Sequence, residues 1–398
     1  MKIKKLLTGA LLALSILFTS VLPLPGSVAE AAPRASSDMR GIWVSYNDYA
    51  KLGLANVNES TYRAHVADFL DTASSHGFNT VILHVRAFDD AIWKSRTFPA
   101  SSYMTQNASR GVSAAKTYTY DPLKVFLDVA NGYDMEVHAW LNPYRITLTK
   151  FLDPAKSTNQ SRVRKAIKEL SKYDIAGIHF DDYFYHSQGG YVKNYKSEKV
   201  YNKAISPAKK RTNVNKLIKS CYRLCHSRGL VFGISPQGNY DNDMNSGADV
   251  KTWLSKNKYV DYVAPQIYWT NQYGASGNVK MFSDRLNQFD RLHTNDAKLY
   301  AGLALYRTGM NYTDDPGWAR SNTNMQEQIM EASQTGWDGY IMFSAAYLYN
   351  SESAQERYNF TNAGASANNT SVTKTAETIG EESEEEEEES TGTIDLML

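Results

Sequence analysis

The sequence predicts an α/β protein whose main part, residues 38–362, folds as one (β/α)8 TIM barrel with long loops after its strands. Three observations support this prediction. Eight short apolar segments follow one another along the chain, helical patterns separate most of them, and several of the segments end in polar side chains. Parallel strands need crossover connections, and eight such strands can close into a barrel. We therefore expect one domain rather than two.

The predicted strands are short and rich in β-branched and aromatic residues, as buried parallel strands require. In chain order they are residues 41–46, 80–86, 136–142, 176–185, 231–235, 261–268, 299–305 and 339–343. The helices between them carry apolar residues at helical spacing. They are residues 61–76, a helix that begins at Asp121 and Pro122, and residues 161–173, 213–228 and 324–335.

Two long connections interrupt this pattern, over residues 94–120 and 186–208. A loop as long as the first is usually a binding element in a compact domain. A doubly wound open sheet is the alternative fold. It is disfavoured because no Gly-rich fingerprint follows the first strand and such a sheet seldom uses eight successive units.

Both ends of the chain are predicted to lie outside the barrel. Three lysines precede an apolar run over about residues 6–24, and Ala29–Ala31 offers a small-x-small cleavage pattern. We expect a secretory signal peptide over residues 1–31, with an uncleaved membrane anchor as the alternative. Residues 363–398 are polar and include an unbroken acidic run at 384–389, which predicts a disordered tail.

The net charge of +1 combines an acidic tail with a basic body. Residues 371–398 contribute −9 and the signal segment +2, which leaves +8 for the remainder. A basic exported body suits an anionic environment such as a cell wall. We expect the protein to be secreted or associated with the cell envelope, with no integral membrane segment after signal cleavage.

Cysteine and histidine usage argues against metal binding. Cys221 and Cys225 are the two cysteines, four residues apart on a predicted helix, where disulfide geometry is seldom met. We expect two buried thiols. The sequence contains no Cys/His cluster, so we expect neither a metal nor another cofactor, and no nucleic-acid partner.

Polar side chains converge at the carboxyl ends of four predicted strands, where barrel enzymes carry their active sites. Because side chains alternate along a strand, Asp181 is expected to point into the barrel mouth and Asp182 away from it. The residues that share the inward phase are His84, Arg86, His138, Trp140, Asn142, His179, Asp181, Tyr183, Gln266 and Tyr268.

These polar residues have more than one interpretation. The histidines could be neutral core residues bonded to one another. Arg86 needs a carboxylate partner if it is buried. Asp181 favours a catalytic function, since a buried carboxylate costs free energy unless something requires it. Aromatic residues at the rim could offer flat faces to sugar rings; these are Tyr144, Tyr185, Trp269, Tyr306 and Tyr347.

Several segments resemble the glycosyl-hydrolase-like family 10. They are Met39–Val44, Val85–Arg86 with Asp90–Ala91, Tyr120–Leu123, Glu136–Arg145, Gly177–Tyr185, Gly233–Pro236 and Pro265–Trp269. The resemblance covers about residues 38–350. It implies a TIM barrel, export to the cell envelope and hydrolysis of glycan chains, with peptidoglycan strands as the favoured substrate. It also implies a retained site at Asp90, Asn142, Arg145, Asp181, Asp182, Gln266 and Tyr268.

The fourth strand also resembles the chitinase-type Asp-x-Asp-x-Glu arrangement, with a difference. Aligning Asp181 with the last Asp places His179 on the preceding Asp and Tyr183 on the catalytic Glu. The proton donor of that mechanism is therefore missing. The seventh strand also lacks a carboxylate at residues 305–307, so a retaining pair of glutamates on strands four and seven is not evident.

The leading hypothesis is a glycoside hydrolase acting on O-glycosidic bonds, with Asp181 as an essential carboxylate and Asp182 or Asp90 as its partner. The expected substrate is a cell-wall glycan. Its candidate binding residues are Arg86, Trp140, Asn142, Tyr144, Arg145, His179, Tyr183, Gln266, Tyr268 and Trp269. The alternative is a carbohydrate-binding barrel that keeps the groove without the reaction.

Overall fold

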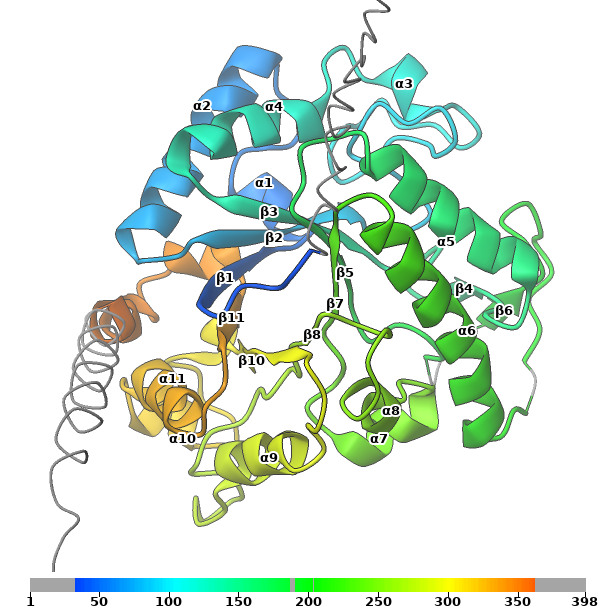
Figure 1. Ribbon diagram of the computed structural model, residues 1–398. Coiled ribbons are helices and arrows are strands. Elements are labelled where there is room, and N and C mark those ends of the chain that lie inside the picture. The colour runs from blue at the N-terminus through cyan, green and yellow to red at the C-terminus, as the bar shows by residue number, and fades with distance from the viewer. Residues whose placement is uncertain (1–32, 187–189, 203, 362–398) are drawn as a thin grey trace, which may run out of the picture. The chain divides into compact units, whose positions relative to one another are not determined.

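A computed structural model describes residues 33–186, 190–202 and 204–361 (Figure 1). The predicted signal peptide and acidic tail lie outside the described residues. One parallel sheet runs in the order β10-β11-β1-β2-β3-β5-β7-β8-β9. Because β9 and β10 are neighbouring pieces of one chain segment on either side of Tyr300, the two ends of the sheet meet and it closes into a barrel of eight strand positions. This confirms the predicted fold class.

The barrel strands lie close to the predicted ones, with two differences that bear on the site. The fourth predicted strand ends early, at Phe180, and only two residues of the sixth form regular pairs. The strands are β1 (Met39–Val44), β2 (Thr80–Arg86), β3 (Glu136–Leu141), β5 (Gly177–Phe180), β7 (Val231–Ile234), β8 (Tyr262–Val263), β9 (Lys298–Leu299), β10 (Ala301–Leu303) and β11 (Gly339–Phe343). An unpredicted second sheet pairs β4 (Lys150–Leu152) with β6 (Gly190–Val192), in the loops after β3 and β5.

Helices surround the barrel (Figure 1). They are α1 (Asp48–Lys51), α2 (Glu59–Ser75), α3 (Ala114–Thr117), α4 (Pro122–Ala130), α5 (Ser157–Leu170), α6 (Pro207–His226), α7 (Tyr240–Ser246), α8 (Val250–Trp253), α9 (Met281–Asp290), α10 (Gly317–Arg320) and α11 (Asn324–Gln334). Short 3-10 turns occupy Asn131–Tyr133, Leu305–Arg307 and Ala345–Leu348. None of the helices within the described ranges is long and apolar enough to cross a membrane.

Helix α6 begins earlier than predicted because its start carries good capping chemistry. The Ser206 side chain accepts a hydrogen bond from the Lys209 N–H, and Pro207 occupies the first turn. Cys221 and Cys225 lie on the buried face of this helix as free thiols, which confirms the prediction of two buried thiols.

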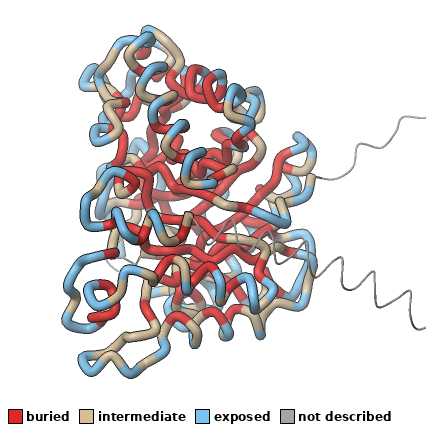
Figure 2. Tube along the Cα trace, turned by 90° about the vertical axis from the view of Figure 1, so that its left-hand side faces the viewer, coloured by how far each residue is buried: buried red, intermediate tan, exposed pale blue. Residues whose placement is uncertain are grey.

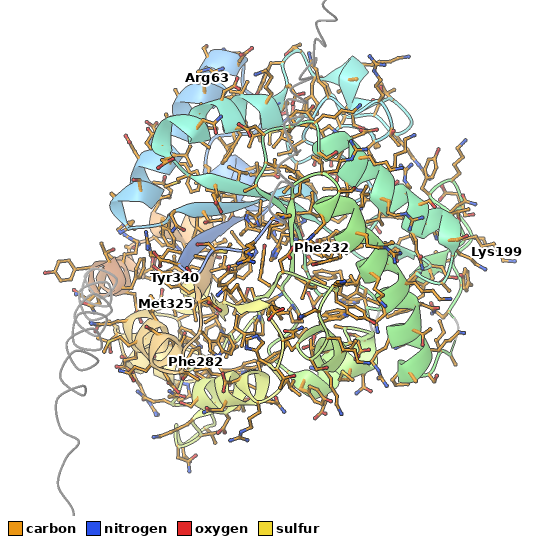
Figure 3. The ribbon with its side chains drawn as sticks, in the orientation of Figure 1. Arg63, Lys199, Phe232, Phe282, Met325 and Tyr340 are labelled. Atoms are coloured by element: carbon orange, nitrogen blue, oxygen red, sulfur yellow. The ribbon has the colours of Figure 1, made fainter. Side chains whose placement is uncertain are left out.

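Apolar side chains pack in two clusters, an outer layer between barrel and helices and an inner layer inside the barrel. The buried residues follow the strands through the centre of the molecule (Figure 2). Phe282, Met325 and Tyr340 belong to the outer layer, whereas Arg63 and Lys199 project into solvent (Figure 3). The inner layer contains large rings, and the chain makes room for them with glycines on neighbouring strands. The buried residues of the inner layer are Met39, Trp43, Ile82, Trp140, Val231, Tyr262, Ala264, Tyr300 and Ile341.

Two glycines show how tightly the barrel interior is filled. A Cβ added at Gly233 would lie 2.0 Å from Cζ of Tyr262, and one added at Gly177 would lie 2.8 Å from Nδ1 of His138. The Tyr262 ring therefore occupies the space that a side chain at position 233 would take. In this way a bulky polar residue can lie on the barrel axis without leaving a void.

Inside the barrel, polar groups form a continuous hydrogen-bonded chain. The indole Nε1 of Trp43 donates to Nε2 of His179 (3.3 Å). An indole nitrogen only donates, so neutral His179 carries its proton on Nδ1 and donates it to the Tyr262 hydroxyl (2.8 Å). That hydroxyl in turn donates to Nδ1 of His138 (3.0 Å). Burial and the nearby His138 lower the pKa of His179 well below its usual value, in keeping with the neutral ring.

The position of His179 in this hydrogen-bonded chain differs from its predicted role in substrate binding. His179 is fully buried, and its ring nitrogens contact Trp43, Tyr262 and the Ser235 hydroxyl. It therefore supports the barrel mouth from below, and the prediction that it binds substrate is wrong. Of the two interpretations of the inner histidines, the core role holds for His138 and His179.

We predict that Gly233→Ala destabilises the protein by about 3 kcal/mol, because the new methyl group displaces the Tyr262 ring and breaks its bonds to two histidines. Gly132→Ala is the matched control, since a Cβ there meets nothing within 4 Å, and its effect should stay within about 1 kcal/mol. Urea unfolding measures both, and equal stabilities for the two variants would contradict the close packing described above.

Candidate active site

Asp181 lies where β5 enters the barrel mouth. It is 2% exposed, and its carboxyl group accepts hydrogen bonds from Nε1 of Trp140 (3.3 Å) and from the Tyr183 N–H (3.2 Å). Burial raises its pKa well above the usual value, and the charge of Asp182 raises it further. The Tyr183 N–H, Arg145 and Trp140 offset only part of this rise. Asp181 is therefore a carboxyl group that keeps its proton more firmly than an ordinary aspartate does.

Asp182 also faces the site, which corrects the prediction that it points away. Strand β5 ends at Phe180, and the Phe184 N–H bonds back to the Asp182 carbonyl (2.8 Å), so the chain turns here. Strand alternation does not apply beyond the last paired residue. Asp182 is half-buried, which raises its pKa, while side-chain hydrogen bonds from Gln237 and Gln266 lower it.

Sequence reasoning did not find a third carboxyl group, Asp243. It is fully buried in α7, where its Oδ1 accepts the Gln237 N–H (2.9 Å) and its Oδ2 has no hydrogen-bond partner. Burial, followed by the charge of Asp182, raises the pKa of Asp243 well above its usual value. Its position shortly after the fifth strand was the available signal, but Asp243 also resembles an ordinary acidic residue in the first turn of a helix.

Gln237 and Gln266, which follow β7 and β8, both hydrogen-bond to Asp182 through their side chains. A bridge joins Gln237 to Gln266, and another joins Gln266 to Gly302. The Gln266 side chain also donates to the Ser235 carbonyl (3.1 Å). Gln266 was predicted from the strand pattern, whereas Gln237 was missed because it follows the end of β7. The structure brings both to the same carboxylate.

An arginine surrounded by aromatic rings forms one wall of the mouth. The guanidinium carbon of Arg145 lies 4.4 Å from the ring centroid of Tyr183, 5.0 Å from that of Phe88 and 5.8 Å from that of Tyr46. Arg145 is 6% exposed, and its positive charge acts on Asp181. Cation–π contacts of this kind hold a guanidinium in place without neutralising its charge. The structure thus places Arg145 and Tyr183 beside Asp181.

Trp140 forms the floor below Asp181. Its ring stacks on His84 with centroids 3.5 Å apart and an interplanar angle of 9°. Nε2 of His84 contacts Oδ1 of Asn142 (3.2 Å). Burial lowers the pKa of His84 well below its usual value, and Arg145 adds to this effect, so the ring is neutral. Asn142 is fully buried, and its side chain contacts His84, which lies under the Trp140 ring.

Tyr268 and Trp269 follow the short strand β8. Tyr268 is half-buried, and its ring centroid lies 5.8 Å from that of Tyr306 and 6.2 Å from that of Phe343. The charges of Asp182 and Asp181 both act on its hydroxyl, after burial, to raise the pKa. The half-buried Trp269 packs against Gly238 of the loop after β7. Tyr268 therefore lies near the carboxyl pair.

Three predicted site residues have surroundings that differ from the expectation. Arg86 is fully buried, paired with Asp89 and donating to the Asn142 carbonyl (2.6 Å), so it does not reach a substrate. Tyr144 is also fully buried, in the layer between barrel and helices, and not at the rim. Asp90 accepts the Phe88 N–H (3.0 Å) and the Ser101 side chain, which orders the loop after β2.

In the part of the chain that the structure describes, no group of three or more His, Cys, Asp or Glu side chains could hold a metal ion.

Comparison with known proteins agrees with this geometry. A sequence model of the family "Glycosyl hydrolase-like 10" matches residues 38–151 and 147–320. The chain belongs to this family. It is a glycosidase, and the matched ranges include Asp181, Asp182 and Asp243.

Two curated relatives carry names of the same kind. Glycosyl hydrolase DigH of Escherichia coli K12 is 28% identical over 409 residues, covering 84% of this chain and 89% of DigH. Glycosyl hydrolase YngK of Bacillus subtilis is 27% identical over 343 residues, covering 73% of this chain and 64% of YngK.

Solved structures share the fold. An endo-1,4-beta-mannanase from Rhizomucor miehei aligns with a TM-score of 0.53 at 9% identity, over 84% of this chain and 98% of the mannanase. The PgaB glycoside hydrolase domain from Bordetella bronchiseptica aligns with a TM-score of 0.51 at 11% identity, over 81% of this chain and 99% of that domain. At such identities the likeness concerns the barrel alone.

We predict that Arg145→Gln raises the pKa of Asp181 further, because it removes a positive charge that stabilises the carboxylate. Arg145→Lys keeps the charge and should leave that pKa closer to the wild-type value. Carbon NMR of labelled aspartate carboxyl groups follows the titration directly. A pKa of Asp181 that falls or stays constant in Arg145→Gln would show that Arg145 does not act on it.

We also predict a pH-dependent gain in stability for Asp243→Asn. A carboxyl group whose pKa is raised in the folded state binds its proton more tightly than in the unfolded chain, so it lowers the free energy of unfolding as pH rises above its ordinary pKa. The neutral amide removes this penalty, so the variant should gain relative to wild type from acid towards neutral pH.

Urea unfolding at a series of pH values measures this difference. Asp241→Asn, at an exposed position of the same helix, is the control and should show little change with pH relative to wild type. A constant difference between Asp243→Asn and wild type across the series would mean that Asp243 does not hold a proton in the folded state.

Proposed function

We propose that this glycosidase is exported to the cell envelope and hydrolyses O-glycosidic bonds in peptidoglycan strands. The observation that carries the proposal is the pair of consecutive carboxyl groups, Asp181 and Asp182, which follow the carboxyl end of β5, where the charge of Asp182 raises the pKa of Asp181. Glycoside hydrolysis needs two such groups in different protonation states.

Their surroundings suggest different roles for the two groups. Asp181 is the more deeply buried, and its raised pKa suits a group that donates a proton. Asp182 receives side-chain hydrogen bonds from Gln237 and Gln266, which stabilise the ionised form. Asp90 bonds within its own loop, so Asp182 is the better candidate for the partner carboxylate.

In the proposed reaction, Asp181 protonates the glycosidic oxygen as its bond to the anomeric carbon breaks. The Asp182 carboxylate stabilises the positive charge that develops on the sugar ring. Water then adds to the anomeric carbon and gives up a proton, which restores the acid. Tyr268 offers an aromatic surface near the reacting sugar, and Trp140 and Arg145 help to set the acidity of Asp181.

The choice of peptidoglycan and of the envelope depends on features of the chain outside and around the site. The N-terminal sequence has the features of a secretory signal, and the body between signal and tail carries a charge of +8. The resemblance to the glycosyl-hydrolase-like family 10 favours peptidoglycan glycan among envelope polymers.

We predict that Asp181→Asn lowers glycan cleavage by about a thousandfold, because the amide cannot donate the proton. Asp174→Asn, the same change at an exposed position before the amino end of β5, is the control and should keep wild-type activity. New reducing ends from peptidoglycan strands freed of peptides provide the assay, with chitin and mannan oligosaccharides as alternative substrates.

Normal turnover by Asp181→Asn would exclude Asp181 as the acid. Cleavage of chitin or mannan in preference to peptidoglycan strands would overturn the proposed substrate but keep the reaction. Binding of glycan by the wild type without new reducing ends would favour the carbohydrate-binding alternative.

A further inference from the structure

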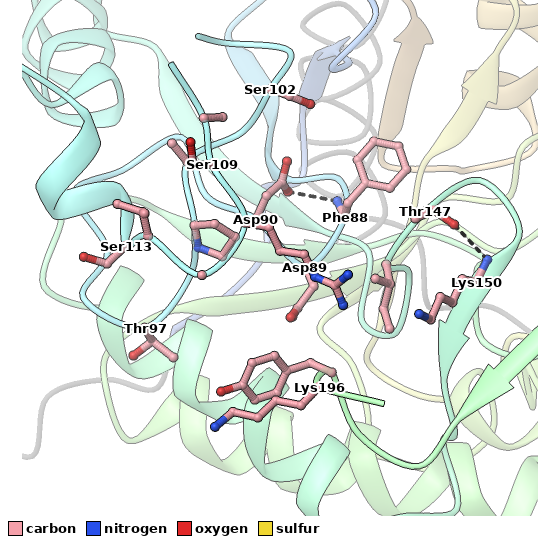
Figure 4. Close-up of a pocket in the computed structure, with 18 of the residues that line it drawn as sticks. Phe88, Asp89, Asp90, Thr97, Ser102, Ser109, Ser113, Thr147, Lys150 and Lys196 are labelled. Atoms are coloured by element: carbon pink, nitrogen blue, oxygen red, sulfur yellow. Dashed lines mark hydrogen bonds between the residues drawn. The ribbon is translucent and has the colours of Figure 1, made fainter. Parts of the chain in front are cut away.

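A cavity of about 1060 Å3 lies beside the barrel mouth, separate from the carboxyl pair. Its walls come from the long loop after β2, the segment that follows β3, and residues 195–198. Figure 4 shows Thr97 and Ser113 on its left, Thr147 and Lys150 on its right, and Lys196 below. The proposed mechanism uses none of these five residues.

Phe88 connects this cavity to the site. Its ring lines the cavity, and the same ring lies 5.0 Å from the guanidinium carbon of Arg145, whose charge acts on Asp181. Phe88 also stacks on Tyr103, with centroids 5.5 Å apart, and Tyr103 lines the cavity as well. Phe88 therefore contacts both the cavity and the arginine that acts on Asp181.

Two of the three acidic residues that line the cavity are paired with basic residues. Asp89 pairs with Arg162 (2.7 Å) and with Arg86. Glu198 pairs with Lys150 (3.1 Å) and with Arg110, which joins the loops that form the walls.

Two cations remain available. Arg96 and Lys196 line the cavity and are exposed, and among the described residues no carboxylate pairs with either of them. The lining carries five basic residues and three acidic ones, so its charge favours an anion. Cations without a partner in a concave site are available to a ligand carboxylate.

The rest of the lining suits sugars. Tyr103 and Tyr195 are 38% and 41% exposed, so part of each aromatic ring is open to a sugar. The guanidinium carbon of Arg162 lies 3.8 Å from the Tyr195 ring centroid, which holds that residue in place. Hydroxyl groups supply hydrogen bonds around the cavity; they belong to Thr97, Ser102, Ser109, Ser113 and Thr147.

We propose that this cavity binds carboxylate-bearing sugar units of the same glycan chain, away from the bond being cleaved, with Arg96 and Lys196 as the groups that contact the carboxylates. The inference rests on the proposed function, since it assigns the cavity to the polymer that enters the site. It adds that recognition of the glycan depends on carboxylates of sugar units that lie away from the bond being cleaved.

Calorimetric binding tests this in the full chain with Asp181→Asn, which prevents turnover. Two ligands are compared: peptide-free peptidoglycan strands with free carboxylates, and the same strands with the carboxylates reduced to alcohols. Reduction should weaken binding by about fivefold, as expected for the loss of two exposed ionic contacts. Adding Arg96→Ala and Lys196→Ala should weaken binding of the free-carboxylate strands to the same level and abolish the discrimination.

The matched control adds Lys116→Ala and Lys199→Ala instead. These exposed lysines come from the same two chain segments but do not line the cavity, and Lys199 projects away from the body in Figure 3. This variant loses the same charge and should discriminate between the ligands as its parent does. If it loses discrimination equally, net charge is responsible and the assigned site is wrong.

Two further outcomes separate this inference from the proposed function. Undiminished discrimination in the Arg96 and Lys196 variant, or no discrimination by the parent, overturns the cavity assignment even if the wild type cleaves the strands. Charge-dependent binding through Arg96 and Lys196, with no new reducing ends from the wild type, overturns the proposed reaction and supports the cavity.

Discussion

Asp181 and Asp182 are held together at the end of β5, away from bulk water, and much of the barrel mouth compensates for the electrostatic cost of that arrangement. Two like charges in a poorly solvated place cannot both form easily, so burial raises both pKa values and the charge of Asp182 raises that of Asp181 further. The donors around them differ. Asp181 has Trp140 and a backbone N–H, whereas Asp182 has two glutamine side chains. This difference separates the roles of two chemically identical groups.

The barrel interior supplies the rigidity that such a pair requires. Trp43, His179, Tyr262 and His138 are hydrogen-bonded in series, and glycines on neighbouring strands leave space for the rings of Tyr262 and His138. Unpaired polar groups in this region would destabilise the fold, but paired ones define a single arrangement. The histidines that looked catalytic in the sequence therefore act as structural polar groups. Their effect on the site is indirect, through the position of β5.

Buried ion pairs fix the long loop after β2, as the hydrogen-bonded chain fixes the barrel interior. Asp89 bonds to Arg86 below it and to Arg162 on α5, so the loop is tied to both the barrel and the helix layer. Arg86 also holds the Asn142 carbonyl at the end of β3. A loop anchored in this way can line a cavity with a defined shape. The same contacts remove Arg86 from the substrate-facing surface.

The sequence by itself determined the barrel and most strand positions, because these depend on periodicity, and it predicted Asp181 at the end of the fourth strand. It determined the family through the resemblance of several segments to the family pattern. Tertiary structure alone decided the direction of Asp182, the burial of Tyr144 and the approach of Asp243 and Gln237. Alternation of side chains holds only while a strand is paired, and β5 stops one residue before the first carboxylate. Beyond that point, contacts between loops that are distant in the sequence set each direction, and no local pattern records them.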